Sequence, residues 1–295
     1  MYIKSFKLTT VMLFLVVFGA NAQKINEITG FQNPESVVFH KEHLFVSNMG
    51  DKTDLSLKDG MGYISMLSRK DGSVMEQKFI TGLNAPKGMY VKGNTLYVTD
   101  IDRVLGFDIT SKKQVWEIDL SPNGVTYAND ISKARGGFYV SSTMNDAIYK
   151  VKKSGSVKQL QIKGDKTHGA NGLYTRCGKL YAANYGRGGT PDGSFGKMGT
   201  CSKKYKEFDK GGAYDGIGWL KGNVIVTDWV NPSGDNGCLI MHKPGSDVMR
   251  IIDLGRPIGG PADLCVDKKN KIVWIPAQRE NKLLWIPFDE IHRAQ

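Results

Sequence analysis

The chain has 295 residues, of which 40% are apolar and 23% charged, with 35 glycines and a formal net charge of +11. This composition is typical of a soluble globular protein with a substantial core and is too polar for a protein embedded in a membrane. The four cysteines lack metal-type spacing, and in an oxidising compartment they allow one or two disulfides. They are Cys177, Cys201, Cys238 and Cys265.

Residues 1–22 have the layout of a signal peptide. Lys4 and Lys7 precede an apolar run from Val11 to Phe18, and Ala20-Asn21-Ala22 places small residues before Gln23. The run is too short for a good membrane-spanning helix, and no cysteine that could carry a lipid follows it. We therefore expect an exported protein, periplasmic or secreted, whose mature chain (23–295) has a charge of +9.

Short alternating strands, bounded by Gly, Asn and Lys turns, follow to the end of the chain. The strand at 24–28 precedes the first repeating unit, so we expect it to complete the last unit and close a ring. Further strands are expected at 36–39, 43–47, 62–68 and 75–80; at 88–91, 95–99, 104–108 and 114–120; and at 131–133, 137–141, 147–151 and 157–162. Later units give 172–175, 179–183, 237–242, 248–254 and 282–287. The insertion 185–199, with six glycines and no periodicity, is interpreted as a long loop.

Each unit begins with a triplet of a polar, a short and an aliphatic residue. The triplets are Glu35-Ser36-Val37, Lys87-Gly88-Met89, Asn129-Asp130-Ile131, Asn171-Gly172-Leu173, Asp215-Gly216-Ile217 and, less regularly, Ala262-Asp263-Leu264. An apolar strand follows each, and five of the six end on a short polar pair such as Ser47-Asn48. The triplets start 52, 42, 42, 44 and 47 residues apart, a period typical of propeller blades. The sequence therefore predicts an all-β, six-bladed β-propeller of four-stranded blades, one domain over residues 23–295.

The first residue of each triplet should face the central channel, because the first strand of each blade lines it. These ring residues are Glu35, Lys87, Asn129, Asn171, Asp215 and Ala262. Four of them carry carboxylate or amide oxygens, which favour Ca²⁺ or Mg²⁺ over Zn²⁺ or Cu²⁺. A cation would offset the repulsion between two carboxylates in a confined channel. Alternatively, the polar residues begin the inner strands and face trapped water.

The chain resembles the SMP-30/gluconolactonase family and the related paraoxonase-like propellers. The resemblance spans the mature chain as a blade pattern, and its specific motifs are short: Asn129-Asp130-Ile131, Ala170-Asn171-Gly172-Leu173 and Asp215-Gly216-Ile217. It implies hydrolysis of lactones or related esters, with Glu35, Asn129, Asn171 and Asp215 matching the family's calcium ligands. The Asn-Asp-Gly-Lys stretch and following Asp-Pro of the gluconolactonase branch are absent, which argues against an aldonolactone substrate. Lys87 stands where the paraoxonase-like enzymes place a catalytic histidine.

An ion here would polarise a substrate carbonyl while a nearby base accepts a proton from water. Asp215 is a candidate base because it is also a ligand, and Asp130 is a second candidate, although it could instead bind the neighbouring blade. Lys87 could act as a base, bind an anionic substrate group, replace the metal, or pair with Glu35 or Asp130. His168 lies three residues before Asn171 and is either a substrate contact or a solvated loop histidine.

Loops at 48–60, 142–146, 185–199 and 228–236 should surround the mouth on the side of the ring residues. Tyr185 and Trp229 could form an apolar wall for a substrate, with the glycine-rich insertion as a lid. No Gly-x-Ser-x-Gly elbow and no metal-type His pair occurs, which argues against serine hydrolase and zinc chemistry.

Turns between the first and second strands should emerge on the opposite side, which we call the basic face. Its cations are Lys41, Lys92, Lys133, Arg135, Arg176, Lys179, Lys221, Lys268, Lys269 and Lys271. This face could attract an anionic surface or polymer, or serve solubility. The aromatic residues are not interleaved with these cations, which argues against nucleic-acid binding.

The sequence thus predicts a monomeric, exported, calcium-dependent lactonase or esterase acting on a small molecule. The alternatives are a non-catalytic propeller that binds a small ligand, sugar or protein, and a metal-free enzyme that uses Lys87.

Overall fold

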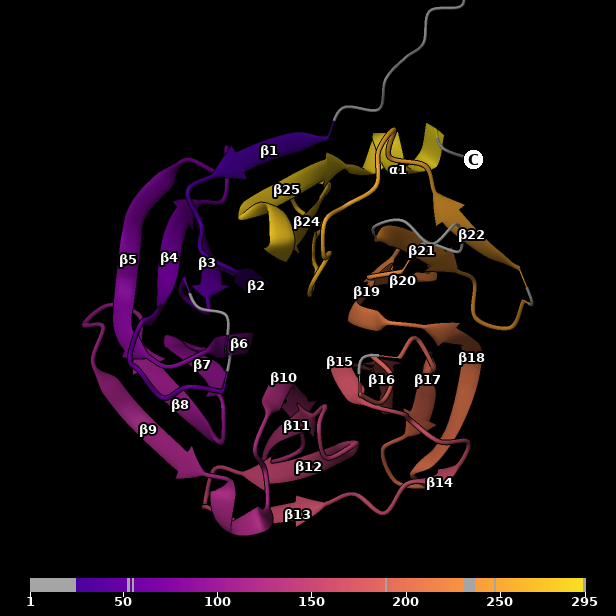
Figure 1. The fold of residues 1–295 in the computed structure, drawn as a ribbon, viewed down its shortest axis with the longest axis horizontal. Helices are drawn as coiled ribbons and strands as arrows, with labels where there is room; N and C mark the ends of the chain where they lie inside the picture. Colours follow the sequence, from indigo (N-terminus) through magenta and orange to yellow (C-terminus); the bar gives the residue numbers. More distant parts are fainter. Residues whose placement is uncertain are drawn as a thin grey trace, which may run out of the picture.

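The fold is a closed ring of β-sheets around a central channel (Figure 1). A computed structural model of the chain describes residues 25–51, 54, 56–188, 190–230, 237–246 and 248–293. The expected signal peptide and parts of the loops at 48–60 and 228–236 lie outside these residues. Within the described ranges, no helix is long and apolar enough to cross a membrane. The predicted six-bladed, all-β propeller is confirmed.

Each blade is a sheet of four antiparallel strands, numbered from the channel outward. Blade 1 has β2 (Pro34–His40), β3 (His43–Asn48), β4 (Gly62–Ser68) and β5 (Val74–Leu83). Blade 2 has β6 (Pro86–Lys92), β7 (Thr95–Asp100), β8 (Arg103–Asp108) and β9 (Gln114–Asp119). Blade 3 has β10 (Ala128–Ala134), β11 (Gly137–Ser142), β12 (Ala147–Lys152) and β13 (Val157–Gln159).

The second half of the chain repeats this arrangement. Blade 4 has β15 (Ala170–Arg176), β16 (Lys179–Asn184), β17 (Gly193–Gly199) and β18 (Lys204–Gly212), with the short β14 (Lys163–Gly164) parallel to β18. Blade 5 has β19 (Tyr214–Leu220), β20 (Asn223–Asp228), β21 (Cys238–His242) and β22 (Met249–Ile252). Blade 6 has β23 (Cys265–Asp267), β24 (Ile272–Ala277), β25 (Lys282–Pro287) and, as its outer strand, β1 (Asn26–Thr29).

The ring closes through strands from both ends of the described chain. β1 pairs antiparallel with β25, as the sequence predicts. Glu27 on β1 forms ion pairs of 2.6 Å with both Lys282 and Arg256. Arg69 of blade 1 also donates two hydrogen bonds of 2.6 Å to Asp267 of blade 6, and both side chains are buried. Blades 1 and 6 are therefore joined by charge-assisted bonds as well as by packing.

The hydrophobic core lies between the blades. Six buried clusters each combine residues from two neighbouring blades: Phe45 of blade 1 packs with Leu96 of blade 2, and Phe195 of blade 4 with Tyr214 of blade 5. The period-two alternation of each strand supplies one apolar face to each neighbour. The polar first strands are thus left to line the channel.

The inner strands break register at the triplets. In blades 1 to 5 the pairing with the second strand skips the first two triplet residues, as between Pro34 and Val37. The skipped residues leave the ladder and face the channel. A Cβ on Gly172 would lie 1.9 Å from the Asp215 carbonyl oxygen, and one on Gly216 would lie 2.5 Å from the Leu264 nitrogen. The short second residue is therefore required by the close approach of neighbouring inner strands.

A hydroxyl at the end of the second strand fastens this break to the next blade. Ser141 accepts from the Asp130 amide and donates to the Asn171 carbonyl, and Thr227 does the same for Gly216 and Ala262. Thr99 donates to the Asn129 carbonyl. We call these hydroxyls inter-blade latches. They explain the first member of the polar pair that ends these strands.

The expectation of a loop over the insertion 185–199 differs from the structure. The second half of the insertion 185–199 is strand β17, and only 185–192 connects β16 to it. Its glycines hide the strand pattern because a Cβ on Gly196 would lie 2.3 Å from the Lys206 carbonyl oxygen. A short helix, α1 (Phe288–Arg293), follows β25, besides single 3₁₀ turns at Ser121–Asn123 and Gln278–Glu280. The four cysteines are unpaired; Cys177 and Cys201 are exposed, and Cys238 is buried.

Candidate functional site

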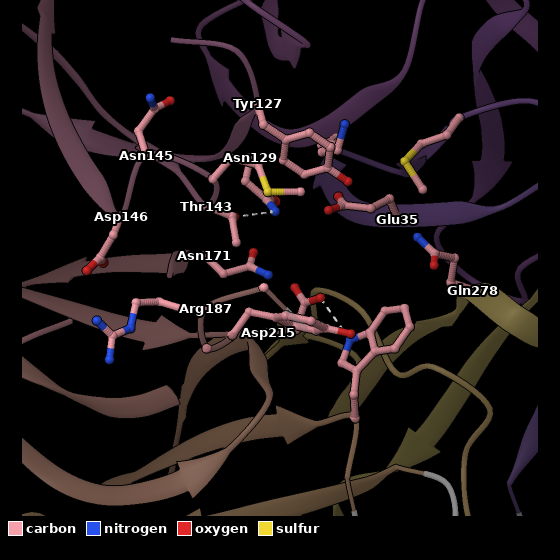
Figure 2. A pocket seen from close by; sticks show the side chains of 17 residues that line it. Glu35, Tyr127, Asn129, Thr143, Asn145, Asp146, Asn171, Arg187, Asp215 and Gln278 are labelled. Carbon is pink, nitrogen blue, oxygen red and sulfur yellow. Dashed lines mark hydrogen bonds between the residues drawn. The ribbon is translucent and has the colours of Figure 1, made fainter. Parts of the chain in front are cut away.

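One end of the channel opens into a cavity of about 530 Å³ (Figure 2). Five of the six ring residues line it, each from the first strand of a different blade: Glu35, Lys87, Asn129, Asn171 and Asp215. The sixth, Ala262, is buried and is not part of the lining. The structure thus places the four expected metal ligands and Lys87 at one cavity.

Glu35 and Asp215 are two buried carboxyl groups that interact across this cavity. Burial, and then the neighbouring Asp215, raise the pKa of Glu35 well above its usual range, while the Lys87 ammonium lowers it. Burial and then Asp263 raise the pKa of Asp215 to about 8, against hydrogen bonds from Trp229 and Asn171 that lower it. The Trp229 Nε1–H donates to Asp215 Oδ2 at 2.9 Å. Burial in this cavity therefore disfavours the charged form of both carboxyls.

Two oxygens at the cavity are buried without a donor. Among the described residues, Glu35 Oε2 and Asn171 Oδ1 have no hydrogen-bond partner. The Asn171 side chain bonds to Asp215, and the Asn129 amide donates to Thr143 Oγ1 at 3.0 Å. A buried acceptor without a partner costs about 1–3 kcal/mol. Such orphaned oxygens are the groups that a bound cation would satisfy.

Lys87 is a buried cation on the same wall, only 1% exposed. Its Nζ donates to the Ala85 carbonyl at 3.2 Å and lies 4.1 Å from the centre of the Tyr127 ring. The ring face and the carbonyl both stabilise the ammonium. Lys87 therefore places its ammonium group near Glu35, where its charge lowers the pKa of that carboxyl.

The outer wall of the cavity is a second ring. The residue directly after the last two residues of the second strand lines the cavity in five blades: Met49, Thr143, Tyr185, Trp229 and Gln278. Tyr185 and Trp229 pack edge to face, with ring centres 5.5 Å apart. Sequence reasoning named only these two, although the blade register would have found the other three. Tyr127, which precedes β10, and Met144 complete an apolar rim.

The structure places Asp130 outside this cavity. Its Oδ2 accepts from the Leu173 amide at 2.5 Å and its Oδ1 from the Ile131 amide at 2.6 Å. Asp130 lines a cavity of about 580 Å³ at the opposite end of the channel, together with Asp263. Its oxygens fasten blade 3 to blade 4, so we do not retain Asp130 as a base.

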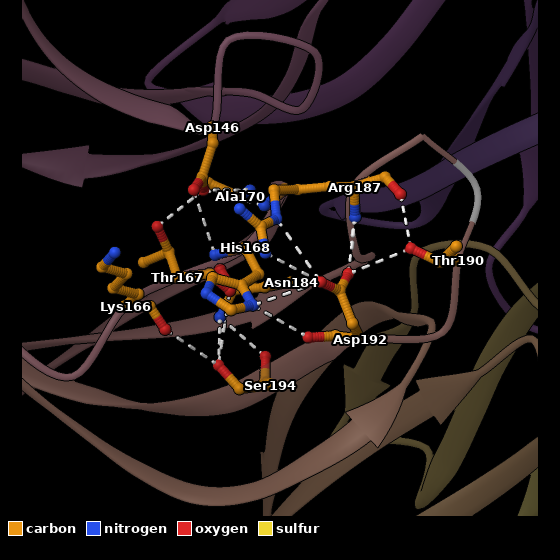
Figure 3. A network of polar contacts seen from close by, with 11 residues as sticks. Asp146, Lys166, Thr167, His168, Ala170, Asn184, Arg187, Thr190, Asp192 and Ser194 are labelled. Atoms are coloured by element: carbon orange, nitrogen blue, oxygen red, sulfur yellow. Dashed lines mark hydrogen bonds and ion pairs between the residues drawn. The ribbon is translucent and has the colours of Figure 1, made fainter.

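His168 also lies away from the cavity, in a polar network beside it (Figure 3). Its Nδ1 is 3.1 Å from the Asp192 carbonyl oxygen and 3.5 Å from Asp192 Oδ2. Its amide donates to Asp146, which also accepts from Thr167 and Gly169. The network orients both the segment that enters β15 and the connection 185–192. His168 therefore positions the cavity wall, and we do not retain it as a substrate contact.

The donor set fits a hard cation bound partly by amides. Across the described part of the chain, no group of three or more His, Cys, Asp or Glu side chains could hold a metal. An ion at this cavity would need Asn171 and Asn129 in addition to the two carboxylates. Carboxylate and amide oxygens without thiolate or imidazole suit Ca²⁺ or Mg²⁺.

The fold and the cavity define a six-bladed β-propeller with a polar site at one end of its channel. No protein-family model and no curated protein matches the chain. Among solved structures it is similar to virginiamycin B lyase from Staphylococcus aureus, with 15% identity and a TM-score of 0.61 over 90% of this chain and 99% of that one.

A streptogramin B lyase structure gives 14% identity and a TM-score of 0.57, covering 89% of this chain and 96% of that one. A chain of a nidogen/laminin complex gives 12% identity and a TM-score of 0.63, covering 79% of this chain and 88% of that one. At these identities the likeness shows a shared fold.

Proposed function

We propose that this chain is an exported hydrolase that opens lactones or related esters with the help of a divalent cation, Ca²⁺ ahead of Mg²⁺. The proposal depends on one observation: the buried oxygens of Glu35 and Asn171 that lack partners border the same cavity as Asp215 and Asn129. Without a bound ion, this arrangement combines two buried carboxyls, of which the Lys87 charge offsets only part, with unsatisfied acceptors. A bound ion would remove both penalties.

Glu35, Asn129, Asn171 and Asp215 would hold the ion. It would supply Lewis acidity toward a substrate carbonyl, and four protein oxygens leave positions of its shell open. Asp215 is the proposed base, because its carboxyl faces the cavity and the Trp229 indole fixes its orientation. The apolar rim, above all Tyr185 and Trp229, would hold the hydrocarbon part of the substrate.

The similarity to lyase propellers supports a catalytic rather than a purely binding role. One neighbour is a virginiamycin B lyase crystallised with quinupristin, in which a histidine-to-alanine substitution abolishes catalysis. No histidine lines the cavity of the present chain, as far as its residues are described, so we propose that the Asp215 carboxylate takes the role of the base here. The nidogen/laminin neighbour supports the second candidate, a propeller that only binds a partner.

The first experiment measures thermal unfolding with Ca²⁺, Mg²⁺ or EDTA. We expect Ca²⁺ to raise the midpoint of the wild type and to leave Glu35→Gln and Asp215→Asn unchanged, because each variant loses a charged ligand. Asp102→Asn is the matched control, since Asp102 lies at the same end of the propeller but pairs with Lys58 at 2.5 Å. A wild type that is indifferent to both ions and to EDTA would contradict the metal site.

The second experiment follows acid release from a panel of lactones and esters. We expect turnover that EDTA abolishes and that falls by roughly 10²–10⁴ in Asp215→Asn. Hydrolysis in H₂¹⁸O places the label in the product, whereas elimination, the chemistry of a lyase, does not. Ca²⁺ binding without turnover on any member would leave only the binding candidate. Turnover that survives EDTA and disappears in Lys87→Met would show that the enzyme is metal-free and depends on Lys87.

A further inference from the structure

The turns opposite the cavity carry an excess of one charge. The hairpins between third and fourth strands end on the same side as the basic face and add Lys70, Lys112, Lys153, Lys203 and Lys243. Every described hairpin on this side has a lysine or arginine in or beside its turn. Among the described residues in or beside these turns the acids are Glu42, Asp71, Asp108 and Asp267, and each has a partner: Lys269, Ser73, Ser111 and Arg69. The helix α1 adds Asp289 and Glu290 on this side, so the cations remain in clear excess. Surface charge of either sign makes a protein soluble, and a mixture of positive and negative residues would do so with less repulsion between them. A requirement for solubility therefore does not explain why one face is mostly positive.

Several of these lysines occupy a backbone conformation that is unfavourable for them. The left-handed residues are Lys41 (φ 53°), Lys112 (φ 59°), Lys203 (φ 54°), Lys221 (φ 44°) and Lys271 (φ 56°). Glycine or asparagine adopts this conformation more readily than lysine. Lysine at these positions therefore makes the turns less stable than glycine or asparagine would, while it adds positive charge to the face.

The turns at the cavity end provide an internal comparison. Left-handed residues other than glycine also occur there, and they are Asn33, Ile101, Asp146, His168 and Asn281. None of these described residues is a lysine. The left-handed residues other than glycine are thus lysines on the basic face, apart from Cys177, and are never lysines at the cavity end as far as the chain is described, which points to a function for the charge.

We propose that the basic face docks this protein reversibly onto a membrane that contains anionic lipids. The channel runs along the shortest axis of the molecule, so the basic face is one broad side of a disc (Figure 1). A planar layer of headgroups can meet the hairpin tips of all six blades at once, whereas a linear polyanion would lie across only some of them. Each cation near an anionic surface contributes roughly a fivefold factor in affinity.

This orientation has a geometric consequence for the cavity. Glu35 lies near the start of β2, at the cavity end, and Lys41 follows the other end of the same strand. The cavity therefore opens away from a membrane that the basic face contacts. Docking would leave the site accessible to a soluble ligand.

The test is sedimentation of the chain lacking residues 1–22 with lipid vesicles, so that the apolar run 11–18 cannot contribute. We expect binding to phosphatidylcholine vesicles that contain phosphatidylglycerol, none to pure phosphatidylcholine, and loss of binding at high salt. The variant Lys92→Gln, Lys133→Gln, Lys179→Gln, Lys268→Gln should bind roughly 600-fold more weakly, since four fivefold factors multiply. These four lysines are exposed and have φ outside the left-handed region, so the variant should keep its thermal midpoint.

The control removes the same charge from exposed lysines of the outer strands β5, β13, β14 and β18. It is Lys78→Gln, Lys158→Gln, Lys163→Gln, Lys206→Gln, and it should bind as the wild type does. Equal losses in both variants would reduce the effect to net charge and overturn the proposal. Absence of wild-type binding to the anionic vesicles would do the same, and binding to heparin alone would assign the face to a soluble polyanion instead.

Discussion

At the scale of one residue, Lys221 adds a positive charge at a position where its backbone conformation destabilises the turn. It is exposed at the tip of the β19–β20 hairpin with φ of 44°, and Gly222 follows it. Asn-Gly is the favoured pair for a two-residue turn of this kind. We therefore expect Lys221→Asn to raise the free energy of unfolding by about 0.5–1 kcal/mol, as measured by urea denaturation. Lys92→Asn is the control without a strained φ, and it should give no gain. A loss of stability in Lys221→Asn would refute the idea that these turns are strained.

At the scale of the strand, two blades have no hydroxyl at the position of the inter-blade latch, since blade 4 has Ala183 there and blade 6 has Pro276. Ser141 and Thr227 bridge their own inner strand to the next blade, whereas blade 4 has Ala183 at this position. The partners exist, because the Asp215 carbonyl approaches Gly172 closely. We expect Ala183→Ser to restore the latch and add about 0.5–1.5 kcal/mol to the free energy of unfolding.

The reverse substitution is the matched control for this prediction. Ser141→Ala leaves the buried Asp130 amide and Asn171 carbonyl without that hydroxyl, so it should cost about 1–3 kcal/mol. Both variants are measured by chemical denaturation. A destabilised Ala183→Ser together with an unaffected Ser141→Ala would show that the latch contributes little.

The blade register made much of the molecule predictable from sequence. It gave the ring from Glu35 to Asp215, because the first strand of a propeller blade must line the channel. The register did not predict which of Asn129 and Asp130 faces the cavity, because both leave the β-ladder at the same break. Their neighbours decide this: Asp130 accepts a hydrogen bond from the Leu173 amide, and Asn129 is left to face the cavity. His168 was placed by proximity in sequence, yet its ring contacts Asp192 in a connection whose path the sequence does not fix. Glycines hid β17, because close packing rather than propensity forms that strand.

At the scale of the whole molecule, the channel concentrates negative groups inside a positively charged protein. Four carboxyls share its interior: Glu35 and Asp215 at the cavity, and Asp130 and Asp263 at the far end. Burial is the largest cause that raises the pKa of each, to about 8 for Asp215 and about 6 for Asp263. Because each folded pKa exceeds the unfolded value near 4, the folded state binds more protons than the unfolded chain between about pH 4 and pH 8.

The metal-free protein should therefore lose stability as pH rises. The contribution of these carboxyls is fully present below about pH 4 and is lost as pH passes through the folded pKa values, at about 1.4 kcal/mol per group and pH unit. Surface carboxyls with a lowered pKa, such as Asp71 at about 2, act below this window and do not mask the effect. We expect the thermal midpoint in EDTA to fall by several degrees from pH 5 to pH 8.

Ca²⁺ should reverse that loss, because the ion competes with protons for the same oxygens. Its upward shift of the midpoint should be larger at pH 8 than at pH 5. Glu35→Gln removes one of the interacting charges, so its midpoint in EDTA should fall less over this range and Ca²⁺ should not restore it. A wild-type midpoint in EDTA that is flat or rises toward pH 8 would mean that the channel carboxyls are already compensated within the chain, and that no cation is needed between Glu35 and Asp215.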